Sequence, residues 1–204
     1  MCGIIGYCGP KPAVKVLLEG LKRLEYRGYD SAGICVDVDS QFQIIKRKGK
    51  IRDLCDHVPP DLMGDYGIGH TRWATHGEVN NRNAHPHTDC ACKIAIVHNG
   101  IIENYVILKE KLTSEGHSFQ SETDSEVIAH LIEKYFAGDL EEAVKEAVAL
   151  LKGTYGIVCM HQDNPGQLVG ARNGSPLVMG IGNGEMFLAS DVTAIVSHTR
   201  QVVY

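Results

Sequence analysis

The order of apolar segments along the chain is the feature that most limits its possible folds. Short runs rich in β-branched residues, which are typical of strands, lie on both sides of a central stretch with helical periodicity. Strands are expected at residues 3–7, 33–38, 42–47, 93–98, 156–161, 167–171, 177–180 and 186–189, and in a segment after Ser197. Groups of strands that flank paired helices favour antiparallel sheets in a layered α+β fold over a parallel sheet.

Apolar residues at helical spacing predict the helices, and residues typical of helix ends mark their limits. Thr123 and Glu126 match a capping box, in which the two side chains satisfy backbone N–H groups at a helix start. Gly116 and Gly153 are of the kind that commonly follows a last helical turn. Helices are therefore expected at residues 12–25, about 102–115, from 123 onward and 139–153.

Composition and charge exclude several classes of protein. The chain has 204 residues, 44% of them hydrophobic, which suits one domain with a single large core. Its 20 basic and 25 acidic residues give a net charge of -5 and are spread along the sequence, so no basic patch indicates a nucleic-acid partner. No run approaches the roughly 20 apolar residues that span a membrane, and the start lacks signal-peptide features. We expect a cytoplasmic protein.

Cys2 becomes the first residue of the chain if Met1 is removed, which would give it two chemical roles. A small residue at position 2 favours removal of the methionine. A free α-amino group has a pKa of roughly 7.7 to 8.0, so it can take the proton from the thiol of its own residue. Cys2 would then supply both the nucleophile and the general base. The alternative interpretation is an ordinary chain start followed by a buried strand.

The other cysteines are expected to be reduced thiols without a metal. Seven cysteines, an odd number, argue against a disulfide framework in a chain without an export signal. Cys90 and Cys92 lie near His85 and His87 and could suggest a metal site. Their spacing is shorter than that of common zinc sites, and no second cysteine pair follows. A polar loop before a strand is the favoured interpretation, with neither a metal nor a cofactor.

Several polar segments carry residue types that suit a catalytic site. Arg72 offers a planar fork for a carboxylate. Asn99 and Gly100 predict either a hairpin turn or two donors for the oxyanion of a tetrahedral intermediate. Asp124 would stabilise a helix N-terminus whatever its other role. The segment 24–33 is either a solvated turn or part of the same constellation.

Taken together, these segments resemble the glutamine amidotransferases that begin with a catalytic cysteine, which are N-terminal nucleophile hydrolases. The segments that carry the resemblance occur in the family's order and are Met1-Cys2-Gly3-Ile4, Arg27-Gly28 with Asp30-Ser31-Ala32-Gly33, His70-Thr71-Arg72-Trp73-Ala74-Thr75-His76-Gly77, His98-Asn99-Gly100 and Glu122-Thr123-Asp124. The resemblance covers essentially the whole chain. Among these enzymes, the glutamine–fructose-6-phosphate aminotransferases look most similar at residues 24–33, 49–51, 101–104 and 171–177.

The resemblance implies a four-layer αββα sandwich with two antiparallel sheets, and a hydrolysis that converts L-glutamine to glutamate and ammonia. Cys2 would form a γ-glutamyl thioester, and its own α-amine would act as the base. Asn99 and the N–H of Gly100 would form the oxyanion hole. Arg27 would support the nucleophile by ordering its loop.

The resemblance also assigns residues that bind the substrate. Arg72 would pair with the α-carboxylate of glutamine and Asp124 with its α-ammonium. Residues 73–80 would form a mobile lid. Within the lid, Thr75 and His76 would help to bind glutamine, and Trp73 would stand near the ammonia exit.

The resemblance further implies that residues 1–204 are a glutaminase domain that ends before its last elements and lacks the sugar isomerase half. Fructose 6-phosphate would be reached only through that half, and the full-length protein would be a homo-oligomer that makes glucosamine 6-phosphate. Three alternatives stay open. They are the glutaminase half of another enzyme such as an amidophosphoribosyltransferase, an amidase for other amides, and a catalytically silent binding domain.

Overall fold

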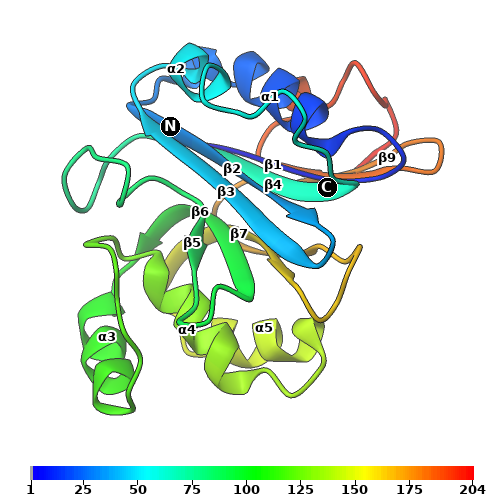
Figure 1. The fold of residues 1–204 in the computed structure, drawn as a ribbon. Coiled ribbons are helices and arrows are strands. Elements are labelled where there is room, and N and C mark those ends of the chain that lie inside the picture. The colour runs from blue at the N-terminus through cyan, green and yellow to red at the C-terminus, as the bar shows by residue number, and fades with distance from the viewer. Residues whose placement is uncertain (1) are drawn as a thin grey trace.

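The computed structural model describes residues 2–204, in which two sheets pack face to face between helices (Figure 1). Met1, and with it the predicted removal of this residue, lies outside the described residues. The strands of both sheets pair antiparallel. The predicted α+β sandwich with helical outer layers and two antiparallel sheets is therefore confirmed.

The larger sheet has seven strands and carries the start of the chain near its centre. Its spatial order is β11 (Val202–Val203), β9 (Val178–Ile181), β10 (Met186–Ala189), β1 (Gly3–Cys8), β4 (Tyr66–Arg72), β2 (Ser31–Val38) and β3 (Gln41–Lys48). The smaller sheet has four strands, in the order β5 (His87–Thr88), β6 (Ile94–Ile102), β7 (Gly153–His161) and β8 (Val169–Asn173).

Helices cover the outer face of each sheet. The larger sheet is covered by α1 (Ala13–Arg23) and α2 (Ile51–Cys55). A short 3-10 turn follows α1 at Glu25–Arg27, and a second follows β10 at Val192–Ala194. The smaller sheet is covered by α4 (Glu126–Tyr135) and α5 (Leu140–Val148), with α3 (Tyr105–Ser114) beside α4. None of the helices among residues 2–204 combines the length and apolar character needed to cross a membrane.

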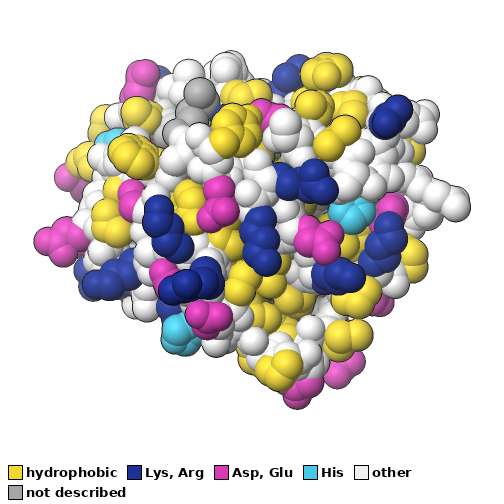
Figure 2. Space-filling model, turned by 90° about the horizontal axis from the view of Figure 1, so that it is seen from above, with side chains coloured by type: hydrophobic (Ala, Val, Ile, Leu, Met, Phe, Trp, Pro, Cys, Tyr) yellow, Lys and Arg dark blue, Asp and Glu magenta, His cyan; other side chains and the backbone are white. Residues whose placement is uncertain are grey.

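Apolar side chains fill the three spaces between these four layers. Leu17 and Leu21 of α1 are fully buried against the larger sheet, and each such burial contributes about 1.5 to 3 kcal/mol. Ile128 and Ala143 belong to the cluster between the smaller sheet and its helices. The layer between the sheets includes Ile4, Cys35, Ile68, Val97, Val158 and Met160. On the face above α1 and α2, acidic and basic side chains are interspersed (Figure 2).

Strand β4 is absent from the sequence-based expectations although it pairs with both β1 and β2. All its residues are buried, so polar and apolar residues do not alternate along it. Gly67 and Gly69 also lower its apparent strand propensity. A Cβ on Gly67 would lie 2.5 Å from the carbonyl oxygen of Cys35, so the close approach of β2 requires glycine there.

Two local predictions need correction. Asn99 and Gly100 do not form a turn, because β6 continues through them to Ile102 and pairs with β7. Gly100 has φ 130°, and a Cβ there would lie 2.0 Å from the carbonyl oxygen of Thr154. The glycine is therefore required by its positive φ and by the close approach of the neighbouring strand β7 rather than by a hairpin.

The capping box at Thr123 is wrong in its helix-start residue. α4 begins at Glu126, and the hydroxyl of Thr123 instead contacts Ser121 Oγ and His87 Nε2. The carboxylate half of the motif does not form either, since the backbone N–H of Thr123 donates to Ser121 Oγ and Glu126 accepts the backbone N–H groups of Gln120 and Ser121. These bonds fix the turn before the helix. The fourth helix starts within one residue of the expected position, and the carboxylate of Asp139 accepts two backbone N–H groups of its first turn.

Candidate active site

Cys2 lies immediately before β1, beside the end of β4. Because Gly3 pairs with Thr71, the thiol comes next to the residues that follow this pair along β4. The backbone N–H of Trp73 donates to Cys2 Sγ at 3.1 Å, and Sγ is 3.6 Å from the carbonyl oxygen of Trp73. Burial raises the pKa of the thiol, although the Trp73 N–H and the charge of Arg72 oppose this shift. At neutral pH the thiol therefore needs a base to become a nucleophile.

The amide of Asn99 faces Cys2 from the other sheet. Its Nδ2 donates to the carbonyl oxygen of Cys2 at 3.2 Å, and its Oδ1 lies 2.9 Å from His70 Nε2. Burial lowers the pKa of His70 to about 3, so this imidazole is neutral. We assign its proton to Nε2 because Asn99 Oδ1 can only accept. His70 thereby holds the NH₂ group of Asn99 toward the cysteine.

One small cavity, of about 30 Å³, brings together most of the residues that the sequence assigned to catalysis and binding. It is lined by Cys2, Arg72, Trp73, Thr75, His76, His85, His98, Gly100, Thr123, Asp124 and Ser125. Asn99 joins this group through its bond to Cys2. A larger hollow, of about 920 Å³, lies at the other end of β1 around Cys8, Asp37 and Tyr66, and includes none of these residues.

Opposite charges stand on two walls of the small cavity. Arg72 ends β4 and is buried, and burial lowers its pKa while Asp30, Cys2 and Asp124 oppose the shift. A guanidinium stays charged in such a setting. Asp124 is also buried and accepts the backbone N–H of Ile102 at 2.8 Å. The pair can recognise a molecule that carries both an anionic and a cationic group.

The segment after β4 closes over the cavity. The guanidinium of Arg72 donates to the carbonyl oxygens of His76, Gly77 and Glu78. The Nδ2 of Asn83 also bonds Glu78 O, at 3.0 Å. A cavity of about 30 Å³ has room for only about one water molecule. In this closed form, backbone carbonyl oxygens therefore occupy the N–H groups of Arg72 that could otherwise bind the carboxylate of a small molecule.

Arg27 lies outside the cavity and supports it. Its Nη1 donates to the carbonyl and hydroxyl oxygens of Ser190 at 3.3 and 3.4 Å, and is 3.7 Å from the carboxylate of Asp191. The same hydroxyl of Ser190 accepts the backbone N–H of Ile4. Arg27 thus connects the turn after α1 to the end of β10 and, through Ser190, to β1, the strand that follows Cys2.

Sequence reasoning gave no role to two residues that organise the site. His70 positions Asn99, and its spacing of two from Arg72 on one strand is the signal that places both side chains on the same face. Asp30 accepts the backbone N–H of Ala74 at 2.6 Å and so fixes the start of the closing segment. Only the fold reveals this second contact, because it joins positions far apart in the sequence.

His98 lines the cavity as a buried side chain. Burial lowers its pKa although the charge of Asp124 opposes this shift, and its Nδ1 lies 2.8 Å from Ser125 Oγ. His76, the other histidine of interest, has its Nδ1 3.7 Å from the carboxylate of Asp124. These contacts orient both rings toward the wall that carries Asp124.

Comparisons with known proteins identify the family of the chain. Residues 70–197 match the family model described as a glutamine amidotransferase domain. The glutamine–fructose-6-phosphate aminotransferase of Thermus thermophilus is 54% identical over 205 residues, which are 100% of this chain and 34% of that protein. The enzyme of the same name from Pyrococcus horikoshii is also 54% identical, over 100% of this chain and 35% of that protein. The chain thus spans about a third of these relatives.

Solved structures give the same result for the fold. The glutamine phosphoribosylpyrophosphate amidotransferase of B. subtilis, solved with ADP and GMP, matches with a TM-score of 0.83 and 28% identity over 97% of this chain and 44% of that chain. A glutamine aminotransferase class-II domain protein from Silicibacter pomeroyi matches with a TM-score of 0.61 and 19% identity, over 92% of this chain and 88% of that chain.

Proposed function

The chain belongs to the glutamine amidotransferase family, and on that premise we propose that Cys2 is the nucleophile that hydrolyses the side-chain amide of L-glutamine. One observation carries the proposal. The thiol of Cys2 and the NH₂ group of Asn99, oriented by His70, adjoin the same cavity as the charges of Arg72 and Asp124. A nucleophile, an oxyanion donor and two recognition charges are thus within reach of one small amino acid.

The chemistry proceeds through a thioester. After removal of Met1, the α-amino group of Cys2 takes the thiol proton, and the sulfur attacks the amide carbon. The Nδ2 of Asn99 and the N–H of Gly100 stabilise the oxyanion. The tetrahedral intermediate collapses, and the α-amino group returns the proton to the leaving ammonia. Water then attacks the γ-glutamyl thioester, which releases glutamate and restores the thiol.

Charge recognition makes the site selective for free glutamine. Arg72 binds the α-carboxylate through a bidentate contact, and Asp124 binds the α-ammonium. A glutamine within a peptide lacks both charges. Thr75 and His76 complete the binding wall, and Trp73, which is 56% exposed, stands at the rim near the ammonia exit.

Substrate entry requires the segment 73–80 to open. Glutamine does not fit into a cavity that holds about one water molecule. The substrate carboxylate must replace the carbonyl oxygens of His76, Gly77 and Glu78 on the guanidinium of Arg72. The segment therefore acts as a lid whose closed form is held by the contacts that the substrate displaces.

Replacement of Cys2 tests the proposal directly. In Cys2→Ala, ammonia release from glutamine is expected to fall to the background rate, because the sulfur nucleophile is lost although the α-amino base remains. Cys8→Ala is the matched control, since Cys8 is the last residue of β1, the strand that follows Cys2, and its Sγ contacts only the carbonyl oxygen of Gly166 among the described hydrogen bonds. Full activity in Cys2→Ala, or its loss in both variants, would overturn the assignment. A chain that retains Met1 is expected to be inactive.

For the whole protein we propose the activity that its relatives' name describes, transfer of the ammonia to fructose 6-phosphate to form glucosamine 6-phosphate. The 54% identity to glutamine–fructose-6-phosphate aminotransferases over the whole chain supports this acceptor. The phosphoribosylpyrophosphate amidotransferase is a more distant relative, at 28% identity. Residues 1–204 would then be the ammonia-producing domain of a cytoplasmic homo-oligomer. Formation of glucosamine 6-phosphate by the longer protein tests the acceptor, and formation of phosphoribosylamine instead would contradict it.

A further inference from the structure

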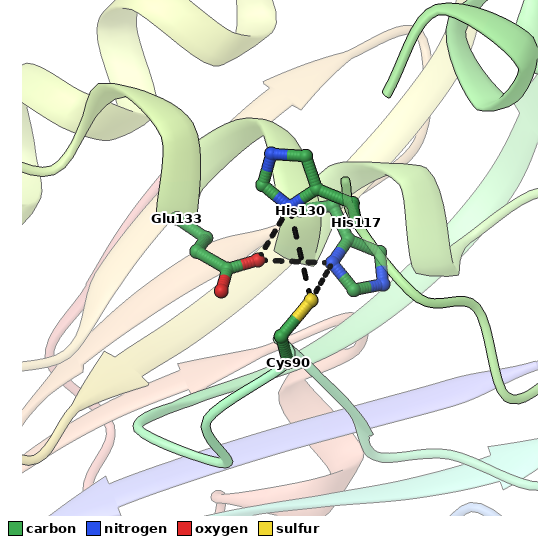
Figure 3. Close-up of side chains that lie close together, drawn as sticks. All are labelled: Cys90, His117, His130 and Glu133. Atoms are coloured by element: carbon green, nitrogen blue, oxygen red, sulfur yellow. Dashed lines mark hydrogen bonds and ion pairs between the residues drawn. The ribbon is translucent and has the colours of Figure 1, made fainter. Parts of the chain in front are cut away.

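A second cluster of reactive side chains lies away from the small cavity, at the edge of the smaller sheet. Cys90, His117, His130 and Glu133 point toward one another from three separate segments (Figure 3). Cys90 lies in the loop between β5 and β6, His117 follows α3, and the other two are one turn apart on α4. The possible ligand atoms of these four residues all lie within 4.8 Å of one another.

The distances match the edges of a tetrahedral zinc site. Cys90 Sγ is 3.8 Å from His117 Nδ1 and 3.6 Å from His130 Nδ1. Ordinary zinc–sulfur and zinc–nitrogen bonds at a tetrahedral angle give an edge of about 3.6 Å. Glu133 Oε2 is 2.7 and 3.0 Å from the two Nδ1 atoms, against about 3.4 Å in such a site. The partly exposed Glu133 side chain can supply the small shift that this difference requires.

The chemistry of the four groups suits zinc better than a harder cation. A thiolate and two imidazole nitrogens are ligands that zinc accepts and that magnesium and calcium avoid. One thiolate and one carboxylate together balance the charge of a divalent ion. Cys90 is exposed and His130 is buried, so an ion can enter from solvent and be held against the helix.

Neighbouring groups hold the ligands in orientations suited to a metal. The backbone N–H of Ser118 donates to Cys90 Sγ at 3.3 Å, which fixes the position of the sulfur. His130 Nε2 lies 3.6 Å from the carboxylate of Glu126, so the ring can bind an ion through Nδ1 while this carboxylate faces its other nitrogen. The ring of Phe119 packs against His130 with 4.3 Å between centroids.

We propose that Cys90, His117, His130 and Glu133 bind one zinc ion in a structural site closed by four protein ligands. The ion ties the loop after β5 and the segment after α3 to α4. Glu126, next to His130, also holds the backbone of the turn that leads to Asp124. The site therefore secures the wall of the glutamine cavity without contacting the substrate.

The sequence did not reveal this site because its ligands are 13 residues or more apart, except for the helical pair. The cysteine and histidines first considered for a metal lie elsewhere. Cys92 Sγ contacts Thr88 Oγ1 at 3.8 Å, and His85 and His87 are buried beside one another.

Metal titration of Cys2→Ala tests the site without interference from the catalytic thiol. Competition with a chromogenic chelator should show one tightly bound Zn²⁺ per chain. Co²⁺ should give the strong visible bands of a tetrahedral ion and a thiolate-to-cobalt charge-transfer band. Adding Cys90→Ser should abolish the charge-transfer band, and Cys90→Ser and His117→Gln should each weaken zinc binding by more than about 100-fold.

Cys92→Ser, in the same background, is the matched control because Cys92 is an exposed thiol of the same loop. It should bind zinc as tightly as its parent, and far-ultraviolet circular dichroism should report folded chains for all variants. A parent that binds no stoichiometric zinc would overturn the proposal, as would equal losses from Cys90→Ser and Cys92→Ser. Neither result bears on the catalytic role of Cys2, which the glutaminase assay tests separately.

Discussion

Replacing His70 by glutamine should remove part of the sensitivity of the folded chain to acid. Burial lowers the pKa of His70 to about 3, whereas a histidine in an unfolded chain titrates near 6.5. Between these values the unfolded state binds one more proton at this position than the folded state. The contribution of His70 to the free energy of unfolding is therefore fully present above pH 6.5 and is lost as the pH falls toward 3.

Proton linkage gives the size of this effect. A single group with these two pKa values loses about 2 kcal/mol of unfolding free energy between pH 7 and pH 5. Burial also lowers the pKa values of His85 and His87, so their contributions have the same sign. In the metal-free chain His130 acts in the opposite direction, because Glu126 and Glu133 outweigh burial and raise its pKa. Its contribution is present below pH 6.5 and is lost at higher pH.

Urea unfolding at pH 5, 6 and 7 measures the difference. His70→Gln should be about 2 kcal/mol less sensitive to this change of pH than the parent, while its amide can still donate to Asn99 Oδ1. His57→Gln is the matched control, because it makes the same substitution at an exposed position. An unaltered pH dependence in His70→Gln would refute the reasoning that a buried neutral imidazole positions Asn99.

Steady-state ammonia release checks the remaining predictions. Asn99→Ala should lower kcat about 10²- to 10³-fold by removing one oxyanion donor, and a decrease of less than tenfold would remove Asn99 from that role. Arg72→Ala and Asp124→Ala should chiefly raise KM for glutamine, because each removes a charge that binds substrate and transition state alike. Either assignment fails if the affinity for glutamine stays at the parent value.

Elements with regular patterns were predicted well, and those set by tertiary packing were not. The apolar stripe of α1 and the capping aspartate of α5 are local signals, and both helices form close to the expected positions. β4 could not be predicted because burial on both faces removes the alternation that identifies a strand. The short helix α2 was missed since its five residues are too few for a periodic signal.

The residues of the candidate site also fall into two groups, those that the sequence predicts and those that only tertiary contacts reveal. Cys2, Arg72 and Asp124 were identified because their residue types and the order of their segments match a known family, and one cavity collects them. The role of His70 depends on its contact with Asn99, which lies 29 residues away in the sequence, so no local pattern predicts it. The Cys90 cluster depends on where the segment after α3 returns against α4, which only the packing of the helices determines.

Labelling with an electrophilic analogue of glutamine tests the central claim most directly, because it reports on the nucleophile, its processing and its specificity together. A chloroketone analogue that keeps the α-amino and α-carboxylate groups should modify the chain once. Mass mapping should place the label on the sulfur of an N-terminal Cys2, and excess glutamine should protect it. Modification of another cysteine, or inactivation with Cys2 unlabelled, would contradict the account.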